Sequence, residues 1–313
     1  MPFAQFLIFF MLLITGFFCK KYRMLTDTAV NAINKFIIVI GYPCLILARL
    51  TALDMDRAIF INFLLSLLIS VGLLMLFAAY ARLYCSGKRF PGEDRPVAES
   101  AIIYSNNTFM GFPIVITFYG DLGLLYMISA NIAMNVVLFS YGITIFKRGQ
   151  KTQDESASKK LQRLIKTMVH PGIIAAAAGI VLCYNRIELP GFLWDYLDIV
   201  GSVVVPMAII SIGTMLAGGF GLNSFKKKLV MEPVLNRLLV APIITAIVVW
   251  FLPLDPLVKI ILIVSHVLPV AVMVPMFEEQ YGRNKGYAVE LVVVSTILSM
   301  VTIPFAIWIL QSI

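Results

Sequence analysis

The chain has 313 residues, of which 60% are hydrophobic and 13% are charged, and its mean hydropathy is +0.92. A soluble domain carries about 45–50% apolar and about 25% charged residues, so this composition excludes a soluble enzyme and indicates an integral membrane protein. The counts of 20 glycines, 15 prolines and 4 cysteines are ordinary and follow no period. They exclude collagenous, disordered and disulfide-scaffold classes.

The formal net charge of +8 would suit nucleic-acid binding, but the topology of a membrane protein explains it better, because Lys and Arg collect in cytoplasmic loops. The cysteines form no CxxC pair and have no histidine at ligand spacing, so we interpret them as buried thiols rather than a metal site or disulfide framework. Basic residues follow the first apolar run instead of preceding it, which is the reverse of a cleavable signal peptide. We expect residues 2–19 to be a retained first span.

Ten stretches are long and apolar enough to cross the hydrocarbon layer, which takes about 20 residues of helix. In chain order they are 2–19, 28–49, 58–81, 98–118, 124–146, 167–184, 192–218, 229–252, 257–277 and 286–312. The second and eighth stretches carry Lys35 and Arg237 in their interiors, and the fourth and ninth contain Asn, His and Pro. The sequence therefore predicts an all-α transmembrane protein of ten helices.

The basic residues set the orientation of these spans. Of the 25 Lys and Arg, 19 lie in the connections after spans one, three, five, seven and nine, and only Arg49, Arg57 and Arg186 lie in the opposite connections. By the positive-inside rule both termini face outward and the polar stretch 147–166 is a cytoplasmic linker. The linker divides the chain into two five-span halves, 1–146 and 167–313. An odd number of spans in each half makes the halves insert in opposite orientations.

The two halves share matching residues at a nearly constant offset, which indicates an inverted repeat. Gly16 matches Gly179 and Pro43 matches Pro206, each 163 residues apart. Pro113 matches Pro275 and Tyr119-Gly120 matches Tyr281-Gly282, each 162 residues apart. Three segments that share one offset to within one residue are hard to obtain by accident. The proline pair falls in the fourth span of each half.

The fourth span of the first half has the composition of a broken helix. Its segment YSNNTFMGFPIVITFYG (104–120) sets Asn106, Asn107, Thr108 and a glycine before Pro113. Asn and Thr are good N-cap residues, Gly permits an unwound turn, and Pro suits the first helical position. The matching segment SHVLPVAVMVPMFEEQYG (265–282) contains two prolines, so the sequence leaves open whether Pro269 or Pro275 marks its break. The alternative is that Pro113 and Pro275 only kink two packed helices.

Discontinuous helices in matching spans are the sequence signature of a transporter's binding site. Irregular backbone at membrane depth is tolerated only where protein buries it or where it lines a watery cavity. The N-terminal end of a half-helix presents N–H groups and a positive dipole end, so we expect an anion, in particular a carboxylate, to bind there. Asn131 and Asn135 share one face of the fifth span and are further candidates. For all four amides, hydrogen bonding between helices is the alternative role.

Few ionisable groups fall inside the spans, and such groups are functional candidates by default. His266 lies near the middle of its span and could couple protons to transport, or it could be a neutral hydrogen-bonded histidine. Four other charged residues lie within about two turns of a predicted helix end, where long side chains reach the interface; they are Lys35, Glu99, Arg237 and Lys259. The middle of the spans contains no clear acidic residue, which argues against a carboxylate-based sodium or proton site.

The sequence gives no support to an enzyme reading. It contains no GxSxG, HExxH, DDxxD or GxxxxGK[ST] pattern, and its two histidines, His170 and His266, are far apart. Such motifs are what nucleophilic, metal-dependent and nucleotide-hydrolysing enzymes carry. We therefore expect no cofactor, no metal and no ATP-driven pumping.

The same residues resemble the auxin efflux carrier family. The resemblance rests on five segments in order: NTFMGFPIVITFYG (107–120), HPGIIAAAAGI (170–180), VVPMAIISIGTML (204–216), LPVAVMVPMFEEQYG (268–282) and VSTILSMVTIP (294–304). It implies ten helices in two inverted five-helix repeats, similar to sodium/proton antiporters and bile acid symporters, with the fourth and ninth helices crossing at prolines. Pro113 and Pro275 match those prolines, Pro269 lies close by, and Asn107 matches the family's substrate-contacting amide.

The resemblance also implies a substrate and an assembly. Members of the family carry auxin or small mono- and dicarboxylates such as malate and malonate, often as dimers. The chain departs from the plant carriers in its short central linker, so we do not expect regulation through a long phosphorylated loop.

We therefore interpret the chain as a secondary carrier for a small organic anion that works by alternating access in a plasma membrane. Its partners are expected to be a small carboxylate, the lipid bilayer and a second copy of the chain, with no nucleic acid. The predicted substrate-binding residues are Asn106, Asn107, Thr108, Pro113, Asn131, Asn135, His266, Pro269 and Pro275. The alternatives are a sodium- or proton-coupled symporter of another solute on the same fold, a channel, or a receptor.

Overall fold

The computed structural model describes residues 2–86, 89–90, 92, 94–148, 170–217, 222–281 and 285–312. These residues are helical almost throughout, and among them the only extended pairing is one isolated β-bridge. The all-α prediction is thus confirmed for the described part of the chain. Most of the predicted linker, from 149 onward, lies outside the described residues.

Within the described residues, six helical segments are long and apolar enough to cross a membrane, and Pro171–Tyr184 and Pro256–Val267 are shorter apolar helices. The six are Asp27–Thr51, Arg57–Tyr84, Asn107–Lys147, Gly191–Leu216, Lys228–Trp250 and Gly286–Ser312. This is the architecture of a multi-pass membrane protein, and the ten predicted spans stay a prediction. In the longest segment, Gly120 has φ 65° and ψ −161°, a left-handed conformation that favours glycine. It interrupts the segment between two of the predicted spans.

The chain packs into two compact units. The first unit comprises Met1–Phe63, Phe112–Ile128 and Met168–Gly219, and the second comprises Leu64–Gly111, Ser129–Thr167 and Phe220–Ile313. Each unit takes segments from both halves of the sequence. The division by packing therefore differs from the predicted division into repeats 1–146 and 167–313, which remains a separate prediction about sequence symmetry.

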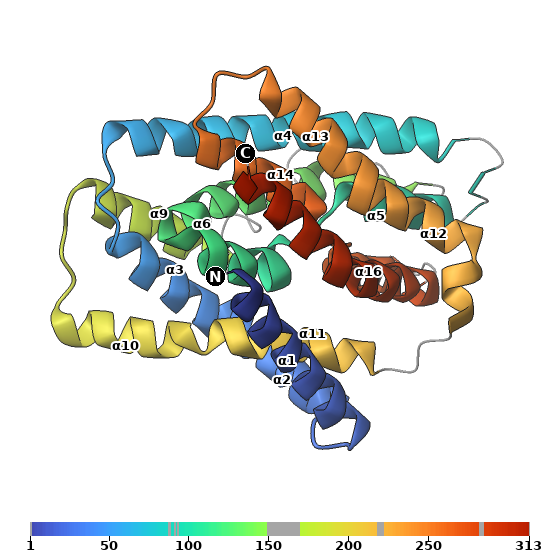
Figure 1. The fold of residues 1–313 in the computed structure, drawn as a ribbon, viewed down its shortest axis with the longest axis horizontal. Helices are drawn as coiled ribbons and strands as arrows, with labels where there is room; N and C mark the ends of the chain where they lie inside the picture. The colour runs from blue at the N-terminus through green and yellow to red at the C-terminus, as the bar shows by residue number, and fades with distance from the viewer. Residues whose placement is uncertain are drawn as a thin grey trace. The chain divides into compact units, whose positions relative to one another are not determined.

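The first unit is a set of closely packed apolar helices. Its elements are α1 (Pro2–Lys21), α2 (Asp27–Phe36), the π-helical segment η1 (Ile37–Gly41), α3 (Tyr42–Thr51), the start of α4 (Arg57–Tyr84), most of α6 (Phe112–Val137), α9 (Pro171–Tyr184), α10 (Gly191–Ser202) and α11 (Val204–Leu216). Helix α1 packs along α11, and α3 packs against α9 and α10 (Figure 1). A Cβ atom on Gly16 would lie 2.0 Å from the carbonyl oxygen of Ile210, so only glycine permits the observed approach of α1 to α11.

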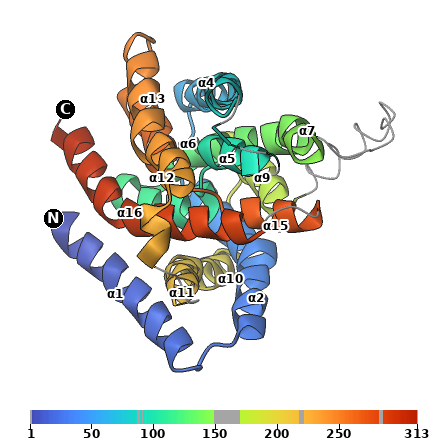
Figure 2. The same ribbon diagram turned by 90° about the vertical axis from the view of Figure 1, so that its right-hand side faces the viewer.

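The second unit is built around α16 (Lys285–Ser312), which packs against α5, α12, α14 and α15 (Figure 2). Its other elements are most of α4 (Arg57–Tyr84), α5 (Asp94–Ile103), η2 (Asn107–Gly111), the end of α6 (Phe112–Val137), η3 (Leu138–Gly142), α7 (Ile143–Lys147), the 3₁₀ turn η4 (Leu222–Lys226), α12 (Lys228–Leu235), η5 (Asn236–Val240), α13 (Ala241–Trp250), α14 (Pro256–Val267) and α15 (Met273–Gln280). The side chains discussed below as the candidate site belong to this unit, apart from Pro113.

Three prolines share a local structure. Pro43, Pro113 and Pro242 are each the second residue of an α-helix that follows a five-residue π-helical segment, η1, η2 and η5 respectively. Proline lacks an N–H and its ring clashes with the carbonyl four residues earlier, and a π-helical turn relieves both problems within a continuing helix. The sequence suggested that Pro113 lies at the first position of its helix. The structure differs, because the helical backbone already starts at Asn107.

Candidate substrate site at the paired helix breaks

Two interrupted helical segments meet in the second unit. Helix α5 ends at Ile103 and helical structure resumes at Asn107, while α14 ends at Val267 and α15 begins at Met273. The extended residues between them pair in antiparallel fashion through the bridge of Ser105 with Val270. The Asn106 N–H donates to the Pro269 carbonyl at 2.9 Å, and the Ala271 N–H donates to the Tyr104 carbonyl at 3.0 Å.

The prolines of the second segment have different positions. Pro269 lies in the extended stretch itself, where its missing N–H costs nothing and its carbonyl accepts the bond from Asn106. Pro275 lies in the first turn of α15. The interruption therefore falls at Pro269, which answers the question that the sequence left open. In the first segment it falls at residues 104–106, upstream of Pro113.

Asparagine side chains organise the restart of the first helix. The Asn106 carboxamide oxygen accepts a bond from the Phe109 N–H at 3.2 Å, as an N-cap residue does. The Ser105 hydroxyl donates to the carboxamide oxygen of Asn107 at 2.8 Å, and the Thr108 hydroxyl donates to that of Asn131 at 3.2 Å. Asn106, Asn107 and Thr108 are consecutive in sequence, and the bond from Thr108 brings Asn131 of α6 next to them; these four residues are called the asparagine group below.

Among the described residues, the amide nitrogens of this group have no hydrogen-bond acceptor. Asn106 and Asn107 are 4% and 2% exposed, and within the described part of the chain the Nδ2 atoms of Asn106, Asn107 and Asn131 donate to no residue. The carboxamide oxygens are occupied and the N–H₂ donors are available, which is the donor pattern that an anionic oxygen would use. Asn135, one turn beyond Asn131 on α6, is half-buried.

Arg237 is the most important residue that the sequence reading placed wrongly. We expected it to reach the membrane interface, but it is fully buried. Its guanidinium donates to four backbone carbonyls: Nε to Leu268 at 3.1 Å, Nη1 to Ile102 at 3.1 Å and to Ile103 at 3.2 Å, and Nη2 to Ser265 at 3.0 Å. The signal in the sequence was a single arginine within an apolar span, which is a functional candidate by default.

These four carbonyls all lie at or just after the C-terminal end of an interrupted helix. Ile102 and Ile103 end α5, and Ser265 and Leu268 lie at the end of α14, so their oxygens have no partner within their own helix. The C-terminal end of a helix also carries the negative pole of its dipole. Arg237 therefore holds two helix ends together and places a positive charge directly beside both breaks.

His266 lies next to this arrangement but bonds elsewhere. Its Nδ1 is 2.9 Å from the Leu262 carbonyl and 3.0 Å from the Ser265 hydroxyl, and its ring packs against Phe77 with centroids 5.0 Å apart. These contacts account for a buried, hydrogen-bonded histidine, which is one of the two roles that the sequence left open. Among the described residues, no hydrogen bond joins it to the asparagine group.

Glu99, also expected near an interface, is fully buried as well. Its carboxylate accepts from Arg95 Nε at 2.8 Å and from Arg148 Nη1 at 2.7 and 2.9 Å, so a buried cluster replaces the expected exposed side chain. Lys35 is exposed and Lys259 is half-buried, and their placement at the membrane interface stays a prediction.

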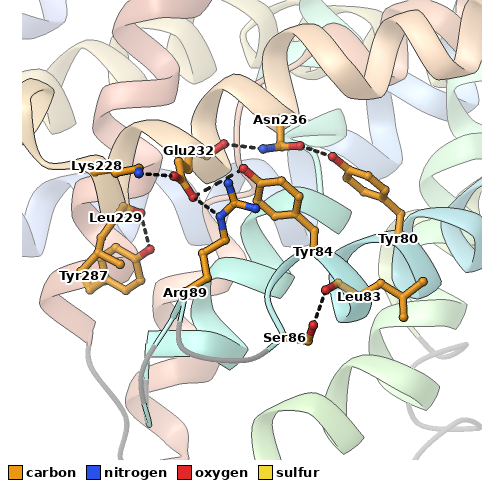
Figure 3. A network of polar contacts seen from close by, with 10 residues as sticks. All are labelled: Tyr80, Leu83, Tyr84, Ser86, Arg89, Lys228, Leu229, Glu232, Asn236 and Tyr287. Atoms are coloured by element: carbon orange, nitrogen blue, oxygen red, sulfur yellow. Dashed lines mark hydrogen bonds and ion pairs between the residues drawn. The ribbon is translucent and has the colours of Figure 1, made fainter.

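A second polar network surrounds the residue next to Arg237 (Figure 3). The Tyr80 hydroxyl donates to the carboxamide oxygen of Asn236, and Asn236 Nδ2 donates to the Glu232 carbonyl at 2.8 Å. The Glu232 carboxylate accepts from Arg89 Nε at 2.9 Å, and the Arg89 guanidinium lies 4.3 Å from the centre of the Tyr84 ring. The network fixes the turn of helix from which Arg237 extends.

Comparisons with known proteins agree with the motifs. The model of a family described as membrane transport protein matches residues 3–307. Over 317 residues the chain is 22% identical to the uncharacterized transporter MJ1031 of Methanocaldococcus jannaschii, and the match covers 99% of each protein. The family resemblance drawn from the sequence is confirmed.

Proposed function

Because the chain belongs to the membrane transport protein family, which is of the auxin efflux carrier type, we propose that this transporter is a secondary carrier for a small organic anion. The proposed substrate class comprises mono- and dicarboxylates and auxin-like acids. The observation that carries this proposal is the group of asparagine Nδ2 donors beside two interrupted helices.

The electrostatics of the site support an anion over a cation. Helical backbone begins at Asn107 and again at Met273, and a helix start presents N–H groups and a positive dipole end. The guanidinium of Arg237 adds a formal positive charge near the same breaks. A carboxylate would thus find donors and positive potential together, whereas a cation would find its natural carbonyl ligands already bonded.

The proposal includes a transport cycle and a topology. Substrate would bind at the paired breaks and be exposed alternately to each side, as in carriers built from two inverted repeats with discontinuous helices. The ten-span arrangement, outward termini, a cytoplasmic 147–166 linker, a plasma-membrane location and a homodimer are parts of this proposal. They are drawn from the charge distribution and the family resemblance.

Counterflow in proteoliposomes tests the proposal. Vesicles loaded with one unlabelled carboxylate are expected to accumulate the same labelled carboxylate without an applied gradient, in a saturable way. Step-like single-channel currents would indicate a channel instead, and saturable binding without flux would indicate a receptor.

Replacement of Asn107 by Ala tests the site itself. A hydrogen bond to a charged group contributes about 1.5–3 kcal/mol, so Asn107→Ala is expected to weaken carboxylate binding about ten- to a hundredfold without loss of folded protein. Isothermal titration or concentration-dependent counterflow measures the change. The control is Asn185→Ala, which removes an exposed amide that bonds only to the Val181 carbonyl of its own helix and should leave affinity unchanged. Equal affinity in Asn107→Ala and the unaltered protein would remove Asn107 from the site.

A further inference from the structure

We propose that Arg237 takes the place of a coupling cation, so that transport at the paired helix breaks does not require sodium. This inference rests on the proposed carrier function, and it assigns to that site a fixed internal charge instead of an exchangeable ion. Arg237 is in this sense a positioning residue, since it acts through the backbone of α5 and α14.

The argument begins with the ligands that a cation would use. In carriers with discontinuous helices, unwound backbone carbonyls and half-helix C-terminal ends coordinate the coupling ion. Here the corresponding carbonyls belong to Ile102, Ile103, Ser265 and Leu268, and each accepts a bond from the Arg237 guanidinium at 3.0–3.2 Å. An oxygen set drawn from both breaks is therefore already bonded to one positive group.

The guanidinium fits this role by its shape. It is planar, carries five N–H donors in a fixed fork and has no acceptor, and all three of its nitrogens are used here. Such a fork can bridge a carbonyl set spread over two chain segments, whereas the three donors of an ammonium group all extend from a single nitrogen atom. The two breaks are also joined by their own backbone bonds, so the carbonyls stay in register with the fork.

The positive charge of Arg237 also disfavours a sodium ion at these carbonyls. Arg237 forms no ion pair with any carboxylate among the described residues, so helix-end carbonyls are its acceptors. No group of three or more His, Cys, Asp or Glu that could hold a metal ion exists in the described ranges. A sodium ion at these carbonyls would have to approach a buried guanidinium of the same sign with no acidic side chain to offset the repulsion.

The position of Arg237 is held independently of its own bonds. The preceding residue, Asn236, is fixed by Tyr80 and by the Glu232 carbonyl. On the opposite side, the Ser295 hydroxyl accepts from the Val270 N–H at 3.1 Å and so ties one of the extended segments to α16. Contacts other than those of the guanidinium therefore hold both the helical turn that carries Arg237 and one of the extended segments whose carbonyl it contacts.

The first test is flux of a labelled carboxylate into proteoliposomes of the unaltered protein, with sodium chloride or choline chloride on both sides. We expect the two rates to agree within a factor of two. Flux that occurs in sodium and disappears in choline would overturn the inference and leave the carrier proposal intact. Absence of flux for every carboxylate in both salts would contradict the carrier proposal, and the stability measurements below would then decide the role of Arg237.

The second test uses the melting temperature of the purified protein and does not depend on substrate. In the unaltered protein, exchange of sodium for choline should leave the melting temperature unchanged. Arg237→Ala should melt at lower temperature, and millimolar methylguanidinium should raise its melting temperature in a saturable way, because a ligand that binds only the folded state stabilises it. No response to methylguanidinium in this variant would overturn the inference, as would a sodium-dependent increase in the unaltered protein.

Two further variants serve this test, one as a substitute for Arg237→Ala and one as a control. Arg237→Lys retains one buried positive charge with three donors, so it should melt between Arg237→Ala and the unaltered protein and show no response to sodium. It is the variant to measure if Arg237→Ala yields no folded protein, and a sodium-dependent increase in its melting temperature would overturn the inference. The matched control is Lys259→Ala, which removes a basic side chain in the first turn of α14 that reaches the Trp250 carbonyl at the end of α13. That variant should be insensitive to methylguanidinium.

Discussion

The two packing units differ greatly in how many polar and charged side chains they bury. Among the described residues, the fully buried charged side chains are Glu99, Arg237 and Glu278, and all three belong to the second unit. The first unit contributes only Ser211 and Thr214 to the buried polar residues. Buried polar groups are costly and are retained where they support a specific structure or function, so the comparison supports the proposed placement of the substrate site in the second unit.

The backbones of the units differ in the same way. In the first unit α1 and α11 are in such close contact that a Cβ on Gly213 would lie 2.1 Å from the Leu13 carbonyl oxygen. In the second unit two helices are interrupted, and their free ends are bonded to a side chain. Close packing of small residues is a stable way to join membrane helices, whereas interrupted helices expose hydrogen-bonding groups that can bind a solute.

Replacement of Gly16 by alanine should prevent the first unit from folding correctly. In Gly16→Ala the new methyl group would collide with the Ile210 backbone oxygen, which cannot move as a flexible side chain can. Overpacking costs about 1–3 kcal/mol and occasionally more, and a clash with backbone belongs to the upper end. We expect little folded protein in fluorescence-detected size-exclusion chromatography.

The control is the same substitution at Gly72 in α4, where a Cβ would have no neighbour within 4 Å. Gly72→Ala should fold normally, because alanine favours the helix by about 1 kcal/mol. Comparable yields of the two variants would mean that α1 and α11 do not depend on glycine contact.

Removal of one buried charge should destabilise the second unit by a smaller amount. Glu99→Gln removes the buried negative charge that accepts hydrogen bonds from Arg95 and Arg148. Loss of one partner costs about 3–5 kcal/mol in a fully buried pair, and we expect about 2–3 kcal/mol here because the two arginine side chains are 29% and 32% exposed. Chemical denaturation or the melting temperature measures the loss.

The pair of Asp54 with Arg186 in the first unit provides the contrast. Their side chains are 85% and 77% exposed and 3.5 Å apart, so Asp54→Asn should cost about 0–1 kcal/mol. If Glu99→Gln were as mild as Asp54→Asn, the buried charges of the second unit would not be structural requirements.

The features that sequence predicted are those encoded locally. The run of Asn106, Asn107 and Thr108 before Gly111 and Pro113 identified the interrupted region because caps and breakers act on the residues beside them. The exact break was missed, since Pro113 is accommodated by a π-helical segment and the extended residues lie upstream of it. Periodicity and composition contain no information on which of these outcomes a proline produces.

The role of Arg237 could not be predicted because its partners are distant in sequence. Distance from a predicted helix end suggested that its side chain would reach the interface. In the structure its acceptors come from residues 102–103 and 265–268, and only tertiary packing brings them together. The same reason explains Glu99, whose second partner, Arg148, is 49 residues away in sequence.

Replacement of His266 should destabilise the second unit less than Glu99→Gln does, and it tests whether this unit contains a proton-coupling group in addition to its fixed charges. The ring nitrogen bonds to the Leu262 carbonyl four residues earlier on the same helix, a contact that a glutamine amide can also make. We therefore expect His266→Gln to lose about 0.5–1.5 kcal/mol of stability and to keep the pH profile of counterflow between pH 5 and 8. Glutamine does not titrate, so a flattened profile in this variant would show that the imidazole exchanges a proton during transport. An unchanged profile would mean that Arg237 and the asparagine donors act without a titrating partner at this position.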